Sequence, residues 1–371
     1  MKPIMFDRRL VHHFDWGLML LTMIICCIGL ATLHSAVSAG AEGGERPYFV
    51  KQMIWYGVGF FAMASVMVVD YRNIDRWAYL IFGGILLLLV CVLLFGKLAG
   101  GSRRWLVLGP VSIQPSELAK IAVIVILARY YSRRVKPEGF SLLELSYPAL
   151  FAAVPFALIV KQPDLGTGLT ILLISGSMTL FVKIERRTLL FLGGVGAVMT
   201  PLVWFLLKDY QRQRILTFLD PERDPLGAGY HIIQSKIAIG SGMTAGKGFL
   251  QGTQNVLSFL PEQHTDFIFS VLAEEWGFIG ASLAVLIFLV LIFMGLNIAY
   301  RCKDPFGKLL SFGVVALIFW QAFINLGMVM GLLPVVGMPL PLVSYGGSSV
   351  LTVMICIGLL MNVSMRQFAT E

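Results

Sequence analysis

The feature that most constrains this chain is a series of apolar runs, each close to 20 residues long and separated from the next by a short charged segment. A helix of about 20 apolar residues is long enough to cross roughly 30 Å of hydrocarbon. Because a bilayer offers the backbone no hydrogen-bond partners, such runs cross it as helices. We therefore predict an all-α, polytopic integral membrane protein with about ten transmembrane helices, over residues 16–37, 50–69, 78–96, 114–131, 143–160, 166–183, 188–207, 266–299, 308–333 and 343–365.

The composition excludes two other classes of protein. The 371 residues are 57% hydrophobic and only 13% charged, whereas roughly a quarter of the residues of a soluble protein are charged. An ordinary soluble enzyme and a disordered chain are both excluded. The net charge of +8 does not indicate nucleic-acid binding, because the Lys and Arg lie mainly in short segments between apolar runs, where positive charge sets orientation. The five cysteines form no CxxC or Cys/His cluster, so no disulfide or metal framework is predicted.

The distribution of Lys and Arg predicts the orientation in the membrane. With a cytoplasmic N-terminus and ten spans, the inner segments hold more than twice as many of these residues as the short outer segments. This excess predicts that the N- and C-termini are both cytoplasmic. Segment 208–265 is predicted to be one large extracytoplasmic loop, and the whole chain, 1–371, a single membrane domain. The eighth run is too long for one perpendicular crossing, so we expect it to begin outside the hydrocarbon, to tilt, or to break near Trp276 and Gly277.

Charged residues at the membrane edge are the strongest sign of function, because burying a charge is expensive and requires a partner. Arg104 and Trp105 precede the fourth run, and Glu117 and Lys120 lie three apart near its outer end, on one helix face. These residues fit either a structural ion pair or the polar wall of a cavity that meets an anion. Asp164, in the outer turn 161–168, fits either a helix cap or a second acid that holds a divalent cation or orients a sugar hydroxyl.

The end of the long loop carries the densest group of acids. Glu262, His264 and Asp266 lie where the chain re-enters the membrane, and Glu274 and Glu275 follow within an apolar stretch. Asp266 by itself would be interpreted as a helix cap, but so many ionisable residues where the chain re-enters the membrane also indicate a functional site. A carboxylate between water and a low-dielectric region can have a raised pKa, which suits a general base.

A fourth polar stretch, 333–349, carries three prolines and three glycines together with Ser344 and Tyr345. Irregular backbone at membrane depth is tolerated only where it is buried in protein or lines a wet cavity. The stretch therefore predicts either a re-entrant structural loop or part of a cavity wall. The sequence holds no P-loop, no GxGxxG or GxSxG motif and no zinc-ligand spacing, so ATP hydrolysis is not expected.

Together these stretches resemble the SEDS family (shape, elongation, division and sporulation) of bacterial peptidoglycan polymerases. The resemblance lies in GSRRWLVLGPVSIQPSELAK, KQPDLGTGLT, the segment from GAGYHIIQSK to LPEQHTDFIFSVLAEEWGFIGA, and GLLPVVGMPLPLVSYGGSS, which extend from residue 101 to residue 349. Three features resemble the elongation (RodA) type more than the division (FtsW) type: the segment FDWGLMLL near the N-terminus, the motif GMPLPLVSYGGSS and the short cytoplasmic tails.

The resemblance implies a glycosyltransferase that polymerises lipid II at the outer face of the cytoplasmic membrane, with Asp266 as the base in an inverting displacement. It further implies a divalent cation, Mg²⁺ or Mn²⁺, held by Asp266 and Asp164, no nucleotide, haem or flavin, and as partners lipid II, a class B penicillin-binding protein and other membrane proteins of the elongation complex. The residues expected to support catalysis and bind substrate are Arg104, Trp105, Glu117, Lys120, Asp164, Lys236, His264, Ser344 and Tyr345.

Three alternatives stay open at the level of sequence. Broken helices and intramembrane acids also describe a lipid II flippase or another transporter, although the ionisable residues here gather on the outer side. A division-type polymerase would share most of the motifs. A scaffold that organises other cell-wall proteins would not need Glu117, Lys120 or Asp266.

Overall fold

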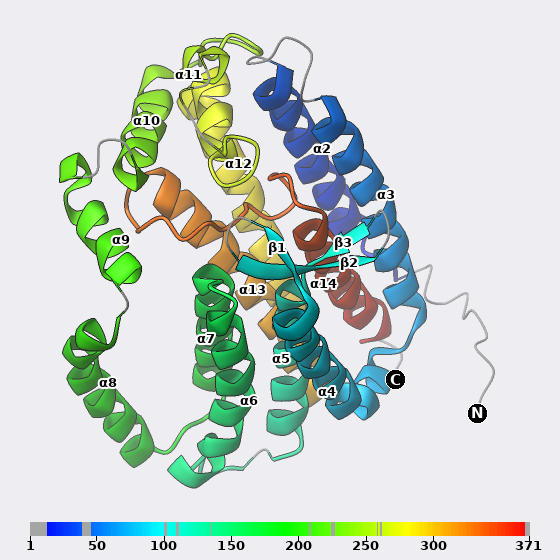
Figure 1. Ribbon diagram of the computed structural model, residues 1–371. Helices are drawn as coiled ribbons and strands as arrows, with labels where there is room; N and C mark the ends of the chain where they lie inside the picture. The colour runs from blue at the N-terminus through cyan, green and yellow to red at the C-terminus, as the bar shows by residue number, and fades with distance from the viewer. Residues whose placement is uncertain are drawn as a thin grey trace.

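The computed structural model describes residues 13–38, 46–99, 102–108, 111–134, 136–207, 209–223, 227–257, 259 and 262–367. Ten long helices lie over the ten predicted runs (Figure 1). They are α2 (Trp16–Ser38), α3 (Arg46–Val68), α4 (Tyr71–Phe95), α5 (Pro115–Ser132), α6 (Leu142–Lys161), α7 (Leu165–Phe181), α8 (Arg186–Leu206), α12 (Ile268–Arg301), α13 (Pro305–Val329) and α14 (Gly347–Arg366). The predicted N-terminal segment and C-terminal tail lie largely outside the described residues.

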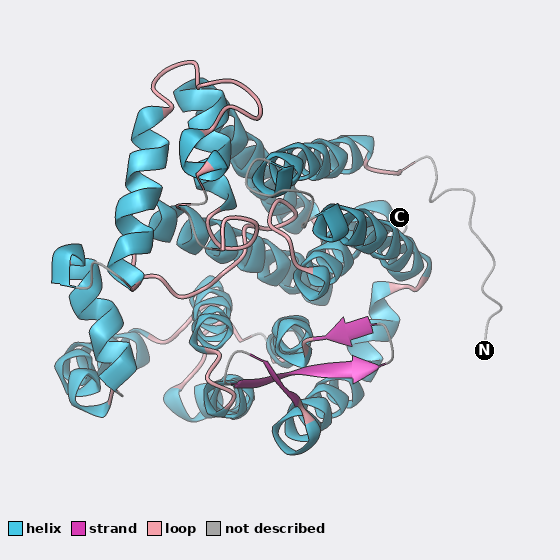
Figure 2. Cartoon of the chain, turned by 45° about the horizontal axis from the view of Figure 1, so that its top comes forward, coloured by secondary structure: helices cyan, strands magenta, loops and turns pink. Residues whose placement is uncertain are grey.

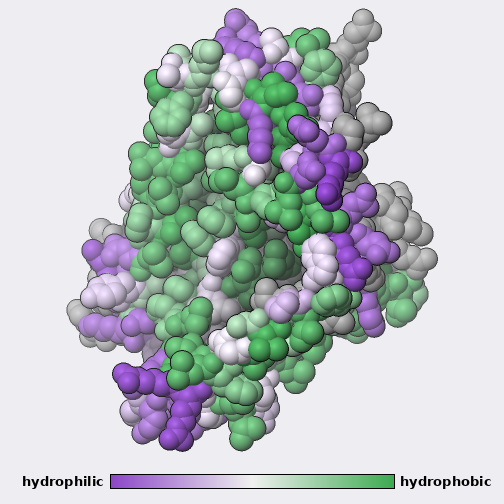
Figure 3. Space-filling model, turned by 90° about the vertical axis from the view of Figure 1, so that its left-hand side faces the viewer, coloured by the Kyte–Doolittle hydropathy of each residue, from purple (hydrophilic) through white to green (hydrophobic). Residues whose placement is uncertain are grey.

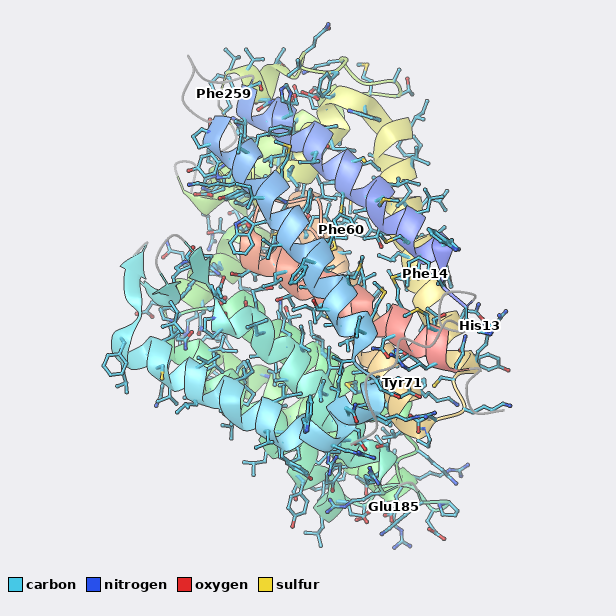
Figure 4. The ribbon with its side chains drawn as sticks, turned by 90° about the vertical axis from the view of Figure 1, so that its right-hand side faces the viewer. His13, Phe14, Phe60, Tyr71, Glu185 and Phe259 are labelled. Atoms are coloured by element: carbon cyan, nitrogen blue, oxygen red, sulfur yellow. The ribbon has the colours of Figure 1, made fainter. Side chains whose placement is uncertain are left out.

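Length and composition identify a polytopic membrane protein, as predicted. Within the described part of the chain, seven helices are long and apolar enough to cross a membrane, and α7 is apolar but shorter. Figure 3 shows hydrophobic residues over the middle of one face and hydrophilic residues mainly toward its ends. Figure 4 shows Glu185 at one end of the molecule, with Tyr71 toward that end, and Phe259 at the opposite end. This arrangement fits the predicted inner and outer loops.

Helices α5, α13 and α14 form the centre of the bundle, where most of their side chains are buried. Close packing there depends on small residues, as is common between membrane helices. A Cβ on Gly313 of α13 would lie 2.5 Å from Cγ2 of Ile124 and 2.9 Å from the sulfur of Met178, so α13 approaches α5 and α7 closely because residue 313 has no side chain. By contrast, the large apolar side chains of α8 point outward, where a bilayer would surround them.

A small antiparallel sheet between α4 and α5 was not predicted from the sequence. It consists of β1 (Lys97–Ala99), β2 (Ser102–Leu108) and β3 (Val111–Ile113), in the order β1-β2-β3. Lys97 pairs with Trp105, and Leu106 pairs with Ile113. Figure 2 shows the three strands lying across the ends of neighbouring helices. The sheet therefore fixes Arg104 and Trp105 above the bundle.

The long loop predicted over 208–265 contains more regular structure than the prediction gave it. It holds α9 (Asp209–Leu219), a 3₁₀ turn η1 (Pro221–Arg223), α10 (Ala228–Ser241) and α11 (Thr253–Val256). Helix α10 packs along the first part of α12, where the hydroxyl groups of Ser235 and Ser270 are 2.8 Å apart. The glycines of α10 hid that helix from the sequence pattern, whereas α9 contains none.

The eighth apolar run, which forms α12, breaks at Gly277, as one of the three predicted alternatives expected. Gly277 has φ 65° and ψ −164° inside α12, so the helix turns sharply there. A Cβ on Gly277 would lie 2.2 Å from the backbone nitrogen of Gly246, and only glycine accepts both this backbone conformation and this contact. The first part of α12 therefore packs with α10 and α11, and the second part forms the span.

Candidate active site

A polar cavity of about 500 Å³ lies where the sheet, the helix ends next to it and the long loop meet. Such a volume is typical of a site that holds one substrate group. Its walls come from β2, the starts of α5 and α7, α9, the turn before α12, and the irregular stretch before α14. The lining residues are Arg104, Trp105, Gln114, Glu117, Pro163, Asp164, Leu165, Thr167, Arg214, Glu262, Thr265, Asp266, Val336, Gly337, Met338, Pro339, Tyr345, Gly346, Ser348 and Ser349.

Asp266 sits in a tight turn that leads into α12. The backbone N–H groups of Thr265, Asp266 and Phe267 all point at the carbonyl oxygen of Glu262, at 3.1, 3.2 and 3.4 Å. Glu262 itself has φ 51°, an uncommon backbone conformation for a residue with a side chain. The turn presents the Asp266 carboxylate to Gly337, where a Cβ would lie 3.3 Å from Oδ2.

The environment of Asp266 raises the pKa of its carboxyl group to about 6. Although part of the side chain faces the cavity, burial is the largest cause, and the negative charge of Glu262 adds to it. The positive charge of Arg214 acts in the opposite direction. A carboxylate with this pKa is ionised near pH 7 and is basic enough to accept a proton from a reacting hydroxyl.

Glu117 and Lys120 form a buried ion pair at the start of α5. The ammonium group of Lys120 donates to both carboxylate oxygens of Glu117, each at 2.8 Å, and the two side chains are 6% and 1% exposed. Both alternatives from the sequence hold in part. The pair is structural, and Glu117 also lines the cavity, whereas Lys120 does not.

Asp164 fulfils its predicted capping role and also lines the cavity. Its Oδ1 accepts from the backbone N–H of Thr167 at 3.4 Å and so caps α7. Its Oδ2 accepts from the amide of Gln114 at 2.8 Å and from the hydroxyl of Ser116 at 3.1 Å. Arg104 binds the same turn, because its guanidinium donates to the carbonyl oxygens of Gln162 and Pro163.

Of the two residues predicted in the irregular stretch, Tyr345 lines the cavity and Ser344 does not. Tyr345 lines the cavity, and its backbone N–H donates to the carbonyl of His264 at 2.9 Å. The His264 ring packs 4.9 Å from the ring of Tyr48 and 6.0 Å from that of Tyr345. Ser344 is buried, and its hydroxyl accepts from the backbone of Leu340, so it shapes the loop and does not line the cavity.

Lys236 is not among the lining residues. It is exposed on α10, and a Cβ on Gly331 would lie 2.8 Å from its Nζ, so its ammonium group reaches the turn after α13. The cavity instead contains Arg214 of α9, which was not predicted from the sequence. Glu262 was noticed in the sequence but was not included among the expected site residues. A helical pattern in residues 209–219 would have indicated a helix there, but not which of its side chains faces the cavity.

The residues present do not fit a resident metal ion well. Among the described residues, no group of three or more His, Cys, Asp or Glu side chains is arranged to hold one. Both oxygens of Asp164 already accept hydrogen bonds from protein donors. A hard cation such as Mg²⁺ is often held by one or two carboxylates together with substrate phosphates. Binding of the predicted divalent cation would therefore require phosphate oxygens of the substrate as additional ligands.

The fold and the cavity together define a polytopic membrane protein with an enzyme-like site under its long loop. A family model for FtsW, RodA and SpoVE, described as "Cell cycle protein", matches residues 13–368. The chain belongs to this family.

Several relatives are similar over nearly their whole length. The peptidoglycan glycosyltransferase MrdB of Escherichia coli K12 is 43% identical over 347 residues, with 92% of each chain covered. A probable peptidoglycan glycosyltransferase FtsW of Geobacter metallireducens is 38% identical, with 97% of each covered. The peptidoglycan glycosyltransferase RodA of Treponema pallidum is 35% identical, with 97% of this chain and 99% of the relative covered.

Solved structures support the same assignment. A chain from the study "Structural coordination of polymerization and crosslinking by a peptidoglycan synthase complex" has a TM-score of 0.81 and 31% identity, covering 96% of this chain and 98% of that one. The crystal structure of Thermus thermophilus RodA has a TM-score of 0.70 and 27% identity, with the same coverage. The predicted SEDS family is confirmed, and the MrdB and RodA matches support the RodA type within it.

Proposed function

We propose that this chain is a peptidoglycan glycosyltransferase that polymerises lipid II at the outer face of the cytoplasmic membrane during cell elongation. The glycosyltransferase class is the one named for its relatives. The observation that carries the proposal is Asp266, a carboxylate with a pKa near 6, in a polar cavity that also holds Arg104 and Arg214. A base beside cations suits a reaction that deprotonates a hydroxyl and releases a pyrophosphate.

In the proposed reaction, Asp266 takes the proton from the 4-hydroxyl of the acceptor sugar. The oxygen then attacks the anomeric carbon of the lipid-linked donor, and a new C–O bond forms as the bond from that carbon to the pyrophosphate oxygen breaks. Undecaprenyl pyrophosphate leaves with the bonding electrons, and the proton on Asp266 returns to water. A single displacement inverts the α-linked donor to a β-1,4 glycan and needs no covalent enzyme intermediate.

The negative charge on the leaving group calls for a cation beside the reacting bond. We infer that Arg214 has this role, because it lines the cavity and its charge acts on Asp266. Arg104 also lines the cavity and can contribute, whereas Lys120 does not line it. A divalent cation bound to the pyrophosphate would neutralise its charge further.

A transpeptidase partner, a class B penicillin-binding protein, is part of the proposal. It is supported by the similarity to a structure whose title couples polymerisation to crosslinking in one synthase complex. Crosslinking requires glycan strands, so an enzyme that makes the strands at the outer face fits such a complex.

The test is polymerisation of purified lipid II by this chain with its transpeptidase partner, in the presence and absence of Mg²⁺ or Mn²⁺. Products are resolved as a ladder of glycan strands. The native chain should give a ladder, Asp266→Asn should reduce it at least about a hundredfold, and Asp209→Asn, which alters an exposed acid on α9, should leave it unchanged.

A ladder of equal strength from Asp266→Asn would remove Asp266 from the reaction. If the native chain gave no ladder but moved lipid II across vesicle membranes, the transporter would replace the polymerase. Loss of activity with a chelator would establish the expected divalent cation, and full activity with a chelator would exclude it.

A further inference from the structure

Asn325, near the outer end of α13, connects two segments of the cavity wall. Its side chain is fully buried. Its amide nitrogen donates to the carbonyl oxygen of Asp266 at 2.9 Å and to that of Met338 at 2.7 Å. One side chain from the centre of the bundle thus binds the backbone of both the turn before α12 and the irregular stretch before α14.

These two bonds determine the identity of the residue. Both partners are carbonyl oxygens, which accept hydrogen bonds and cannot donate them. The NH₂ group of asparagine satisfies both at once, whereas ionised aspartate, although the same size, offers acceptors alone. The Oδ1 atom of Asn325 has no hydrogen-bond partner among the described residues, so the only hydrogen bonds of this side chain there are those donated by its NH₂ group.

The segments that Asn325 joins are those that aim the Asp266 carboxylate. Met338 follows Gly337, which faces Oδ2 of Asp266. The sulfur of Met338 also accepts from the hydroxyl of Thr170, so the same stretch is held to α7. If the bonds from Asn325 were lost, the turn that carries Asp266 could move relative to Gly337.

We propose that Asn325 is a positioning residue for glycosyl transfer, whose amide fixes the Asp266 carboxylate in the direction of the acceptor hydroxyl. This inference rests on the proposed function. Asn325 does not line the cavity, so it acts through Asp266 and not on the substrate. A misplacement of about 1 Å at a reacting group can cost about a hundredfold in rate.

The chain offers a matched control one helical turn away. Gln321 lies on the same helix and is equally buried, but neither of its amide atoms has a hydrogen-bond partner among the described residues. Replacing either amide by leucine removes a buried polar group from α13, and only Asn325→Leu removes bonds to the cavity wall.

The experiment compares the native chain, Asn325→Leu, Asn325→Asp and Gln321→Leu over a series of lipid II concentrations, with thermal unfolding measured in parallel. We expect both Asn325 variants to lower kcat by about 10- to 100-fold with KM changed by less than about twofold. Gln321→Leu should keep kcat within about twofold of the native value.

An unchanged kcat in the Asn325 variants would overturn the inference, as would an equal loss in Gln321→Leu or a rise in KM at constant kcat. If neither Asn325 variant folds while Gln321→Leu does, Asn325 is a folding residue and the inference also fails. A native chain that makes no glycan, or an Asp266→Asn chain that still does, would instead defeat the proposed function or its base.

Discussion

At the scale of single residues, the buried Glu117–Lys120 pair gives a direct prediction for stability. Removal of one partner leaves the other charge buried without compensation, which costs about 3–5 kcal/mol. Lys120→Met and Glu117→Gln should therefore each lower the unfolding temperature markedly. The double variant should be more stable than either single variant, because it leaves no buried charge. Single variants as stable as the native chain in detergent would contradict this account of the pair.

The residues that the sequence identified best are charges next to apolar runs. Asp266, Glu117 and Asp164 could be found because a charged side chain beside an apolar run is costly to bury in any fold, and therefore indicates a partner or a function. Lys236 lies outside the cavity lining, and Arg214, which lines the cavity, was not predicted; both belong to the long loop. The side of α9 or α10 that faces the cavity depends on how those helices pack, and a single sequence does not contain that information.

At the scale of elements, the end of α3 is closed by side chains of α14. The last carbonyl groups of a helix have no partners within it. Asn362 and Arg366 donate to three of them, those of Val66, Met67 and Val68, and Asn362 also donates to the carbonyl of Val69, the residue that follows the helix. Arg366→Met leaves two of these carbonyls unpaired and should lower the free energy of unfolding by about 1–3 kcal/mol.

The control for this prediction is Arg301→Met, which alters an exposed arginine in the last turn of α12. It should shift the unfolding temperature little. Equal shifts in Arg301→Met and Arg366→Met would show that the loss of a terminal positive charge matters, and that the closure of α3 does not.

The elements were predicted unevenly, for physical reasons. The spans could be located because a bilayer demands about 20 apolar residues from each helix. The three strands could not, because Lys97–Ala99 and Val111–Ile113 are too short to show an alternating pattern, and Ser102–Leu108 does not alternate polar and apolar residues. Helix α10 could not be seen because glycines lower helix propensity, while its packing on α12 stabilises it.

At the scale of the whole molecule, orientation is the property to test. Gln251, between α10 and α11, should lie outside the cell, and Glu138, between α5 and α6, should lie in the cytoplasm. In a background without the native cysteines, an impermeant maleimide should label Gln251→Cys in intact cells and Glu138→Cys only after permeabilisation. Labelling in the reverse order would invert the topology and move the cavity to the cytoplasmic side.

The central claim is that Asp266 acts as the base, and the dependence of the polymerisation rate on pH tests it most directly. Only the ionised carboxylate accepts a proton, so the rate should fall as pH drops through about 6. Glu262→Gln removes a charge that raises the pKa of Asp266 and should move the fall to lower pH. Arg214→Gln removes a charge that lowers this pKa and should move the fall to higher pH. His264→Gln should leave it in place, whereas a rate independent of pH between 5 and 8, or shifts of the opposite sign, would contradict the account.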